Sequence, residues 1–325
     1  VLLAVTAAAL LLMAVAAGRL VDAGAADRPQ GEEARLAIGM LVLPALGLAS
    51  SAVPADTLYR GQTLYTAVAV TERPWADGRV VRELSQNGGS SSAEYVEDGT
   101  PAHVYATSSL AILDSLDAYP ERVLVLGGAA LTLPVAFEAR AADVRTDVVE
   151  IDREVTALAS DFFAYGEAER PGIRVMHDDA RVWLRGSDVR YDLVYLDVFD
   201  HLLTVPWTMV TEEALMQMAD ALTPSGVFMV NVLSPLEGPG TAFLERFATT
   251  LEAVFGDVRL YLTDASTDPG ATQNLIVVAT REPGVLPDLP WTEAPITASG
   301  RPLTDDWAPV EYLQAKVFAQ GLRWR

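Results

Sequence analysis

Short apolar runs alternate with amphipathic stretches between residues 122 and 280 of the chain. Apolar runs of this length, bounded by turn residues, are typical of buried strands, and the spacing of apolar residues between them favours helices. The pattern predicts strands near 122–127, 144–150, 173–177, 191–197, 226–232, 257–262 and 274–280. It predicts helices near 133–141, 153–165, 179–185, 211–222 and 241–255.

This alternation predicts an α/β fold with a parallel, doubly wound sheet whose ligands bind at the carboxyl ends of the strands. The last two strands follow each other without a helix, so the final strand is expected to run antiparallel. We therefore predict a seven-stranded, class I methyltransferase-like (Rossmann-like) sheet. It would form a nucleoside-binding catalytic domain over residues 101–285 that opens with a helix from Ala102 to Leu116. A tail and a short helix would follow over 286–325.

Residues 56–100 have a different pattern, in which short apolar and polar runs alternate. Asn87-Gly88 lies between two of these runs and is a pair typical of a two-residue hairpin turn. We expect a small antiparallel β domain ahead of the main sheet.

Residues 1–55 contain two uncharged apolar stretches, Val1 to Gly18 and Leu36 to Val53. Each is close to the length of about 20 residues that spans a bilayer. We predict two transmembrane helices at the end of a larger membrane region; buried helices of a soluble domain are the alternative. Three arginines in the loop between them favour a cytosolic loop, which would put the domain after the second helix outside the cell. The chemistry argued below instead favours a catalytic domain facing the cytoplasm. We give more weight to the chemistry.

The composition limits the classes of function. The chain has 44 acidic and 23 basic residues and a net charge of −21, which argues against nucleic-acid binding. An acidic protein suits a polycationic substrate, although an organism-wide acidic bias is the preferred explanation of the charge. With no cysteine and three scattered histidines, thiolate chemistry is excluded and a metal site is not expected.

The segment from Arg122 to Asp152 has the order strand, glycine turn, helix, strand and acid. The first apolar run ends in Gly127-Gly128, and the second ends in Glu150, about 20 residues further on. This order is typical of a nucleotide-binding unit, in which glycines let a ligand approach the backbone. A carboxylate in the position of Glu150 can accept both hydroxyls of a ribose.

Acidic residues also follow the next two strands, at Asp178-Asp179 and at Asp197 and Asp200. Helix capping is an alternative for Asp179 and for the earlier Asp152, but Asp197 lies too far from the next helix. We predict one cleft at these strand ends. Asp179 would receive an adenine amino group there, with Asp178 as the alternative.

The same cleft offers a base for amine chemistry. A protonated amine cannot attack an electrophile, so a carboxylate that holds the amine and removes its proton would assist the reaction. Asp197 and Asp200 stand where such an amine would enter. Asp152 and Ala180 are assigned to the nucleoside side of the cleft, together with the glycine pair.

The motifs of this chain resemble those of the spermidine synthase (polyamine aminopropyltransferase) family, and most of all its members fused behind a transmembrane helix bundle. The resemblance extends from Tyr59 to about Val232 and returns in the ending LTDDWAPVEYL. Its motifs are LYTAVAV, NGGSSSAEY, HVYATSSLAI, VLVLGGAALTLP, VVEID, HDDAR and YDLVYLDVFD.

The resemblance implies transfer of an aminopropyl group from decarboxylated S-adenosylmethionine to a polyamine, with release of 5′-methylthioadenosine and no metal. It implies that Asp197 accepts the proton, that Glu150 binds the ribose and that Asp179 binds adenine. Tyr105, with Tyr65 as a second aromatic residue, would line the amine channel. The expected partners are the polyamine and the membrane, with no nucleic acid; a homodimer is the assembly that we consider.

Three positions depart from the family pattern. Family members carry GGGDG after the first strand, with an aspartate that holds the amine of the donor, whereas this chain reads Gly-Gly-Ala-Ala-Leu over 127–131. Thr66 replaces an expected glutamine, and His201 replaces an expected proline. Two alternatives therefore stay open: a methyltransferase that uses intact S-adenosylmethionine, and a membrane-attached sensor of polyamines or nucleosides.

Overall fold

The computed structural model describes residues 56–199, 205–295 and 297–319. The two transmembrane helices predicted within residues 1–55, and the candidate residue Asp200, lie outside this part of the chain. Within it, no helix has both the length and the apolar character needed to cross a bilayer.

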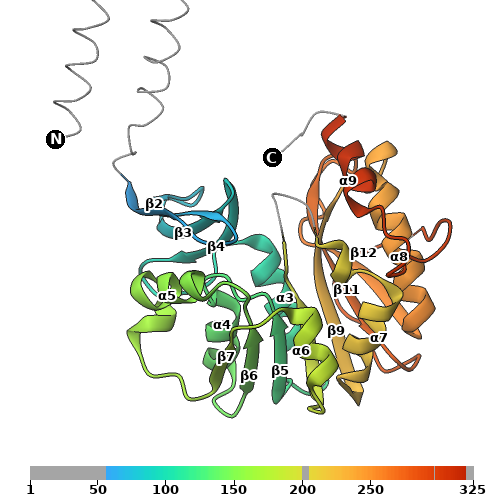
Figure 1. The fold of residues 1–325 in the computed structure, drawn as a ribbon, viewed down its shortest axis with the longest axis horizontal. Coiled ribbons are helices and arrows are strands. Elements are labelled where there is room, and N and C mark those ends of the chain that lie inside the picture. Colours follow the sequence, from blue (N-terminus) through green and yellow to red (C-terminus); the bar gives the residue numbers. More distant parts are fainter. Residues whose placement is uncertain (1–55, 200–204, 296, 320–325) are drawn as a thin grey trace, which may run out of the picture. The chain divides into compact units, whose positions relative to one another are not determined.

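The central sheet has eight strands in the order β12-β10-β11-β9-β8-β5-β6-β7 (Figure 1). Strands β5 to β9 pair in parallel, whereas β11 runs antiparallel to both β9 and β10. The predicted doubly wound sheet with an antiparallel final strand is therefore confirmed. The strands are β5 (Arg122–Leu126), β6 (Arg145–Val149), β7 (Ile173–Met176), β8 (Tyr191–Leu196), β9 (Leu222–Ser234), β10 (Asp257–Leu262), β11 (Gln273–Thr280) and β12 (Glu293–Ala294).

Helices cover both faces of this sheet, because alternate residues of a strand point to opposite sides. In β5, Leu124 and Leu126 join the core under α6 to α9, while Val123 and Val125 join the core under α3 to α5. All of these strand residues are buried. The helices are α3 (Val104–Asp114), α4 (Thr132–Arg140), α5 (Arg153–Phe162), α6 (Ala180–Gly186), α7 (Glu212–Asp220), α8 (Ala242–Val254) and α9 (Val310–Ala319).

The prediction of seven strands was wrong by one, because β12 pairs antiparallel with β10 at the edge of the sheet. This strand lies in the proline-rich part of the tail that was expected over residues 286–325, where no strand was predicted. Pro290 and Pro295 flank it, and since proline cannot donate to a ladder, the added strand stays short and at an edge. The buried side chains of Leu286 and Ala294 attach the segment to the cores on either face of the sheet.

A four-stranded antiparallel sheet precedes the central sheet, as predicted. Its hairpin turn is at Asn87 and Gly88, whose φ angles of 50° and 81° suit a type I′ turn. Its apolar face packs on α5 through Leu84, Val155 and Leu158, so the small sheet and this helix share a hydrophobic cluster (Figure 1). The strands are β1 (Thr57–Gln62), β2 (Ala67–Pro74), β3 (Val80–Gln86) and β4 (Gly89–Tyr95).

Candidate active site

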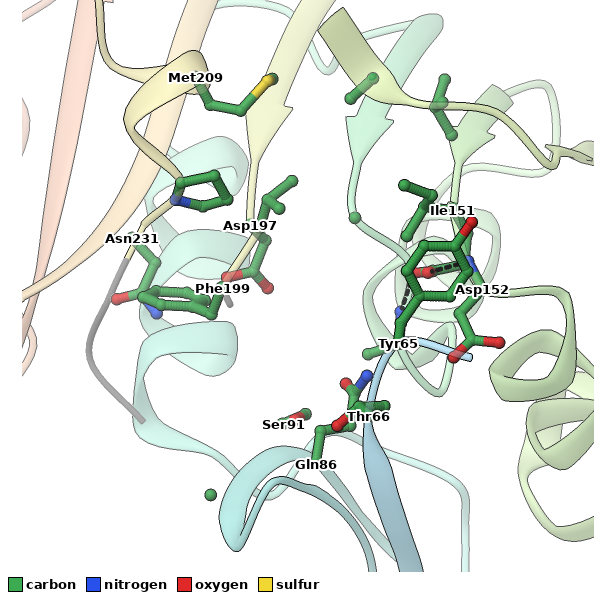
Figure 2. Close-up of a pocket in the computed structure, with 18 of the residues that line it drawn as sticks. Tyr65, Thr66, Gln86, Ser91, Ile151, Asp152, Asp197, Phe199, Met209 and Asn231 are labelled. Carbon is green, nitrogen blue, oxygen red and sulfur yellow. Dashed lines mark hydrogen bonds between the residues drawn. The ribbon is translucent and has the colours of Figure 1, made fainter. Parts of the chain in front are cut away.

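A cavity of about 700 Å³ opens at the carboxyl ends of the parallel strands, between them and the small sheet. Figure 2 shows Asp197, Phe199 and Asn231 on one side of it, and Tyr65 and Asp152 on the other. The cavity brings together most of the predicted site. The predicted residues that line it are Tyr65, Tyr105, Gly127, Glu150, Asp152, Asp179, Ala180 and Asp197.

Gly127 holds the turn after β5 in a conformation that other residues adopt rarely. Its φ is +91°, and a Cβ atom added there would lie 2.5 Å from the backbone oxygen of Asp197. The turn therefore requires glycine for two reasons, its left-handed backbone and its close approach to the end of β8. Gly127 therefore lines the cavity and also allows the backbone of Asp197 to approach closely.

Gly128 does not line the cavity, although we had placed both glycines beside the ligand. A Cβ atom on Gly128 would lie 2.9 Å from side-chain atoms of Leu131 and Val148. Its small size serves packing against β6, and its N–H donates to Glu150 over 2.9 Å. Gly128 thus contributes to the site through the carboxylate that it holds.

Glu150 is a buried carboxylate surrounded by backbone donors. Its Oε2 accepts hydrogen bonds from the N–H groups of Gly128 (2.9 Å) and Ala129 (3.1 Å), and its Oε1 accepts one from Asp152 (2.9 Å). Burial raises the pKa of Glu150, and these three donors counteract that rise. A carboxylate offers about four acceptor positions, so one remains on Oε1. The arrangement leaves room for one ribose hydroxyl on Glu150 rather than for two.

Asp197 follows β8 and lies partly buried in the cavity. Its Oδ2 accepts a hydrogen bond of 3.0 Å from the hydroxyl of Tyr105, and the amide of Asn231 lies beside the carboxylate and helps to lower its pKa. Burial raises the pKa of Asp197 to about 7, against the lowering effect of these two donors. A carboxylate with a pKa close to neutrality is suited to accept a proton.

Tyr105 extends from α3 toward Asp197 and is itself buried. Burial and the neighbouring Asp197 raise its pKa well above the usual range of tyrosine. The phenol therefore stays neutral and acts as a donor to the carboxylate.

Tyr65, unlike Tyr105, is an exposed side chain: it is 56% exposed in the turn after β1. It lines the mouth of the cavity.

Asp152 and Asp179 both cap helices. Asp152 accepts the N–H groups of the first turn of α5, and Asp179 accepts the N–H of Val182 in α6. Asp152 also accepts a hydrogen bond of 2.5 Å from the hydroxyl of Thr63, which directly follows β1. The capping alternative is therefore correct for both residues. It does not remove them from the cavity, which both also line.

Ala130 stands where the resemblance places the aspartate that holds the donor amine. Its side chain is fully buried in the cluster that contains Val70 and Leu158, and its N–H donates to Ser92. The neighbouring Ala129 and Leu131 have φ angles of 43° and 59°, values that favour glycine. The loop keeps the glycine-type backbone and points this position into the core rather than into the cavity.

Sequence reasoning missed Asn231, which lines the cavity in the middle of β9. It is the polar residue in the run from Val227 to Val232, which is otherwise apolar and buried. A polar residue in such a run is an indication that could have been used. His103 precedes α3 and makes no side-chain capping bond. It lines the cavity, with Nε2 2.9 Å from the hydroxyl of Ser90.

The charges around the cavity have one sign. Among its described lining residues there is no lysine or arginine, whereas five carboxylates belong to the lining. Burial lowers the pKa of His103, so this ring is neutral near pH 7. A cationic ligand would therefore be attracted and an anionic one repelled. The carboxylates are Glu150, Asp152, Asp178, Asp179 and Asp197.

Solved structures share this architecture. A probable spermidine synthase from Corynebacterium glutamicum has a TM-score of 0.56 at 20% identity, over 82% of this chain and 95% of that one. A spermidine synthase bound to the transition-state analogue AdoDATO has a TM-score of 0.56 at 18% identity, over 81% and 89% of the two chains. At this level of identity, the comparison shows a common fold.

Curated relatives match at the level of sequence. A probable polyamine aminopropyl transferase from Bifidobacterium longum is 26% identical over 199 residues, which are 61% of this chain and 42% of the relative. A polyamine aminopropyltransferase from Vibrio vulnificus is 29% identical over 141 residues, 42% of this chain and 44% of the relative. The chain thus spans less than half the length of either. The sequence model of the spermine/spermidine synthase domain matches residues 107–282, more than half of the chain, which therefore belongs to the spermine/spermidine synthase family.

Proposed function

We propose that this protein transfers an aminopropyl group from decarboxylated S-adenosylmethionine to an amine, with Asp197 as the proton acceptor. The observation that carries the proposal is the partly buried Asp197 carboxylate, bonded to Tyr105 in a cavity lined by carboxylates. The family membership and the names of the two curated relatives support the same class of reaction.

The reaction needs few groups from the protein. The amine nitrogen attacks the carbon next to the sulfonium, the new N–C bond forms, the C–S bond breaks, and 5′-methylthioadenosine leaves. The proton lost by the amine passes to Asp197. Tyr105 donates to Oδ2 of this carboxylate, which leaves the other oxygen to face the amine. Glu150 and Asp179 are assigned to the ribose and the adenine of the donor.

Charge separates this proposal from a methyltransferase. Intact S-adenosylmethionine carries a carboxylate that would enter a cavity with five carboxylates and, among its described lining residues, no lysine or arginine. Decarboxylated S-adenosylmethionine lacks that group and keeps its two positive charges. Like charges a few ångströms apart in a partly buried site repel each other by several kcal/mol, so the lining disfavours the carboxylate of the intact donor and favours the decarboxylated one.

Calorimetry with the two donors tests this proposal. We expect decarboxylated S-adenosylmethionine to bind at least about tenfold more tightly than the intact donor, which corresponds to about 1.4 kcal/mol. A preference for the intact donor would contradict the proposal and favour the methyltransferase. Tight binding of the decarboxylated donor without turnover on any amine would favour a sensor.

The pH dependence of kcat/KM tests the role of Asp197. Because the base must be ionised to accept a proton, and its pKa is about 7, kcat/KM should fall as the pH drops below 7. The expected slope is about tenfold per pH unit on the acidic side. Initial rates between pH 5 and 9 measure it. A rate that stays constant down to pH 5 would exclude Asp197 as the base.

Location and assembly remain predictions. Attachment to a membrane through residues 1–55, a catalytic domain facing the cytoplasm and a homodimer stay proposals that follow from the sequence.

A further inference from the structure

Asn231 is a buried amide in a strand of apolar residues. It lies in β9, is 3% exposed and lines the cavity. Figure 2 shows it next to Asp197 and Phe199. Its amide lies beside the Asp197 carboxylate and lowers the pKa of that group, whereas its Oδ1 has no hydrogen-bond partner among the described residues.

This pattern of satisfied and unsatisfied atoms fixes the orientation of the amide. An ionised carboxylate only accepts hydrogen bonds, so the atom of Asn231 that faces Asp197 is the donor Nδ2. The carbonyl Oδ1 must then point elsewhere, and among the described residues it has no partner. A buried acceptor without a partner lowers stability. An apolar residue would satisfy the strand better, so the amide is not explained by packing.

We propose that Asn231 is a positioning residue that acts through Asp197: its Nδ2 holds the carboxylate in one rotamer, with an oxygen facing the acceptor amine. The inference rests on the proposed function. Tyr105 holds the carboxylate from α3 on one side and Asn231 holds it from β9. Two donors from different elements restrict the carboxylate more than either would alone, and they stabilise its charged form.

The charged surroundings of Asp197 bear on its titration. Among the described residues, the titratable groups that face it are Tyr105 from α3 and Tyr195 from β8, whose pKa is also raised, mainly by burial. Both stay neutral over the working range of pH. A change in the titration of Asp197 can therefore be assigned to the amide that is removed.

The test compares the titration of Asp197 in the wild-type protein with its titration in Asn231→Leu, both without substrate. Protein labelled with ¹³C at aspartate Cγ is titrated by NMR, and the Asp197 signal is assigned by its loss in Asp197→Asn. In Asn231→Leu we expect the midpoint for Asp197 to rise by about one pH unit, because a hydrogen bond to a charged group is lost. We also expect a melting temperature that is unchanged or higher. An unchanged midpoint in the folded variant would overturn the proposal.

Gln217→Leu is the matched control. Gln217 lies in α7, outside the cavity, and its Oε1 likewise has no hydrogen-bond partner among the described residues. This variant should leave the Asp197 midpoint unchanged; an equal rise in both variants would overturn the proposal.

Should Asn231→Leu fail to fold, the titration of Asn231→Asp decides. A carboxyl at 231 should give two coupled titration steps with Asp197, and two independent steps would count against the contact.

Kinetics separate this inference from the proposed function. In the presence of turnover, Asn231→Leu should lower kcat by about tenfold or more, with the affinity for the donor unchanged and the acidic limb of the pH profile moved to higher pH. An acidic limb that stays in place would contradict the role of Asn231. If the wild-type protein shows no turnover, the proposed function fails, and the NMR titration still decides whether Asn231 positions Asp197.

Discussion

Replacing Asp197 by asparagine is expected to lower the rate of aminopropyl transfer by roughly 10²- to 10⁴-fold, the usual contribution of a general base. Asparagine keeps the size of the side chain and can still accept a hydrogen bond from Tyr105. It cannot take a proton from the amine. Binding of the donor, measured by calorimetry, should change little. Rates are compared at saturating concentrations of both substrates.

The same variant should be more stable than the wild-type protein at high pH. The pKa of Asp197 in the folded state is about 7, above the value of about 3.9 expected in the unfolded chain. The folded state therefore binds this proton more tightly, and the stability contributed by protonated Asp197 is lost as the pH rises toward 7. Between pH 5.5 and 8.5 the stability of Asp197→Asn relative to wild type should increase by about 2 kcal/mol.

Asp188→Asn is the matched control for both measurements. Asp188 is exposed, lies outside the cavity and loses the same formal charge. We expect normal turnover from it and a stability that follows the wild-type protein at both pH values. An Asp197→Asn variant with normal turnover, or with no gain in relative stability at high pH, would disprove the role of Asp197 as a buried base.

Replacing Gly127 by alanine is expected to destabilise the protein by about 3 kcal/mol or more. One part comes from a φ of +91°, and another from a Cβ atom 2.5 Å from the Asp197 carbonyl oxygen. Relief of that contact must move either the glycine turn or the end of β8. Because both carry groups of the site, transfer activity should also fall, even under conditions in which the variant is folded. Urea denaturation and initial rates measure the two effects.

Gly78→Ala separates the two contributions. Gly78 has a similar φ of +85°, but no atom lies within 4 Å of an added Cβ, and the residue lies outside the cavity. Its replacement should cost about 1–2 kcal/mol from the backbone alone, with activity retained. Equal losses of stability in the two variants would show that the close approach of Gly127 to Asp197 is unimportant.

Much of the fold could be predicted from the sequence, because its elements are coded locally. The apolar run from Val123 to Leu126 and the helical spacing after it give β5 and α4 nearly to the residue. The Asn87-Gly88 pair gave the hairpin in the same way. The edge strand β12 was not predictable, since its two residues have no pattern of their own. It forms through pairing with a partner strand that is distant in the sequence.

The candidate site was predictable where strand ends determine position, and not where contacts are long-range. Glu150 and Asp197 follow the parallel strands β6 and β8, which lie on either side of β5, so their convergence was expected from topology. The contact of Asp197 with Asn231 and the bond from Thr63 to Asp152 join segments far apart in the sequence. No local pattern encodes such contacts. The three backbone N–H groups that donate to Glu150 were likewise not predictable, because they depend on the conformation of the loop after β5.

The central claim is that the carboxylates of this cavity serve transfer of an aminopropyl group to an amine. The most direct measurement incubates purified protein with decarboxylated S-adenosylmethionine and a series of di- and triamines, and follows 5′-methylthioadenosine by chromatography. We predict its release in equal amount with an amine that has gained one aminopropyl group, dependent on Asp197. No release with any of these amines, from protein that is folded and binds the donor, would contradict the claim.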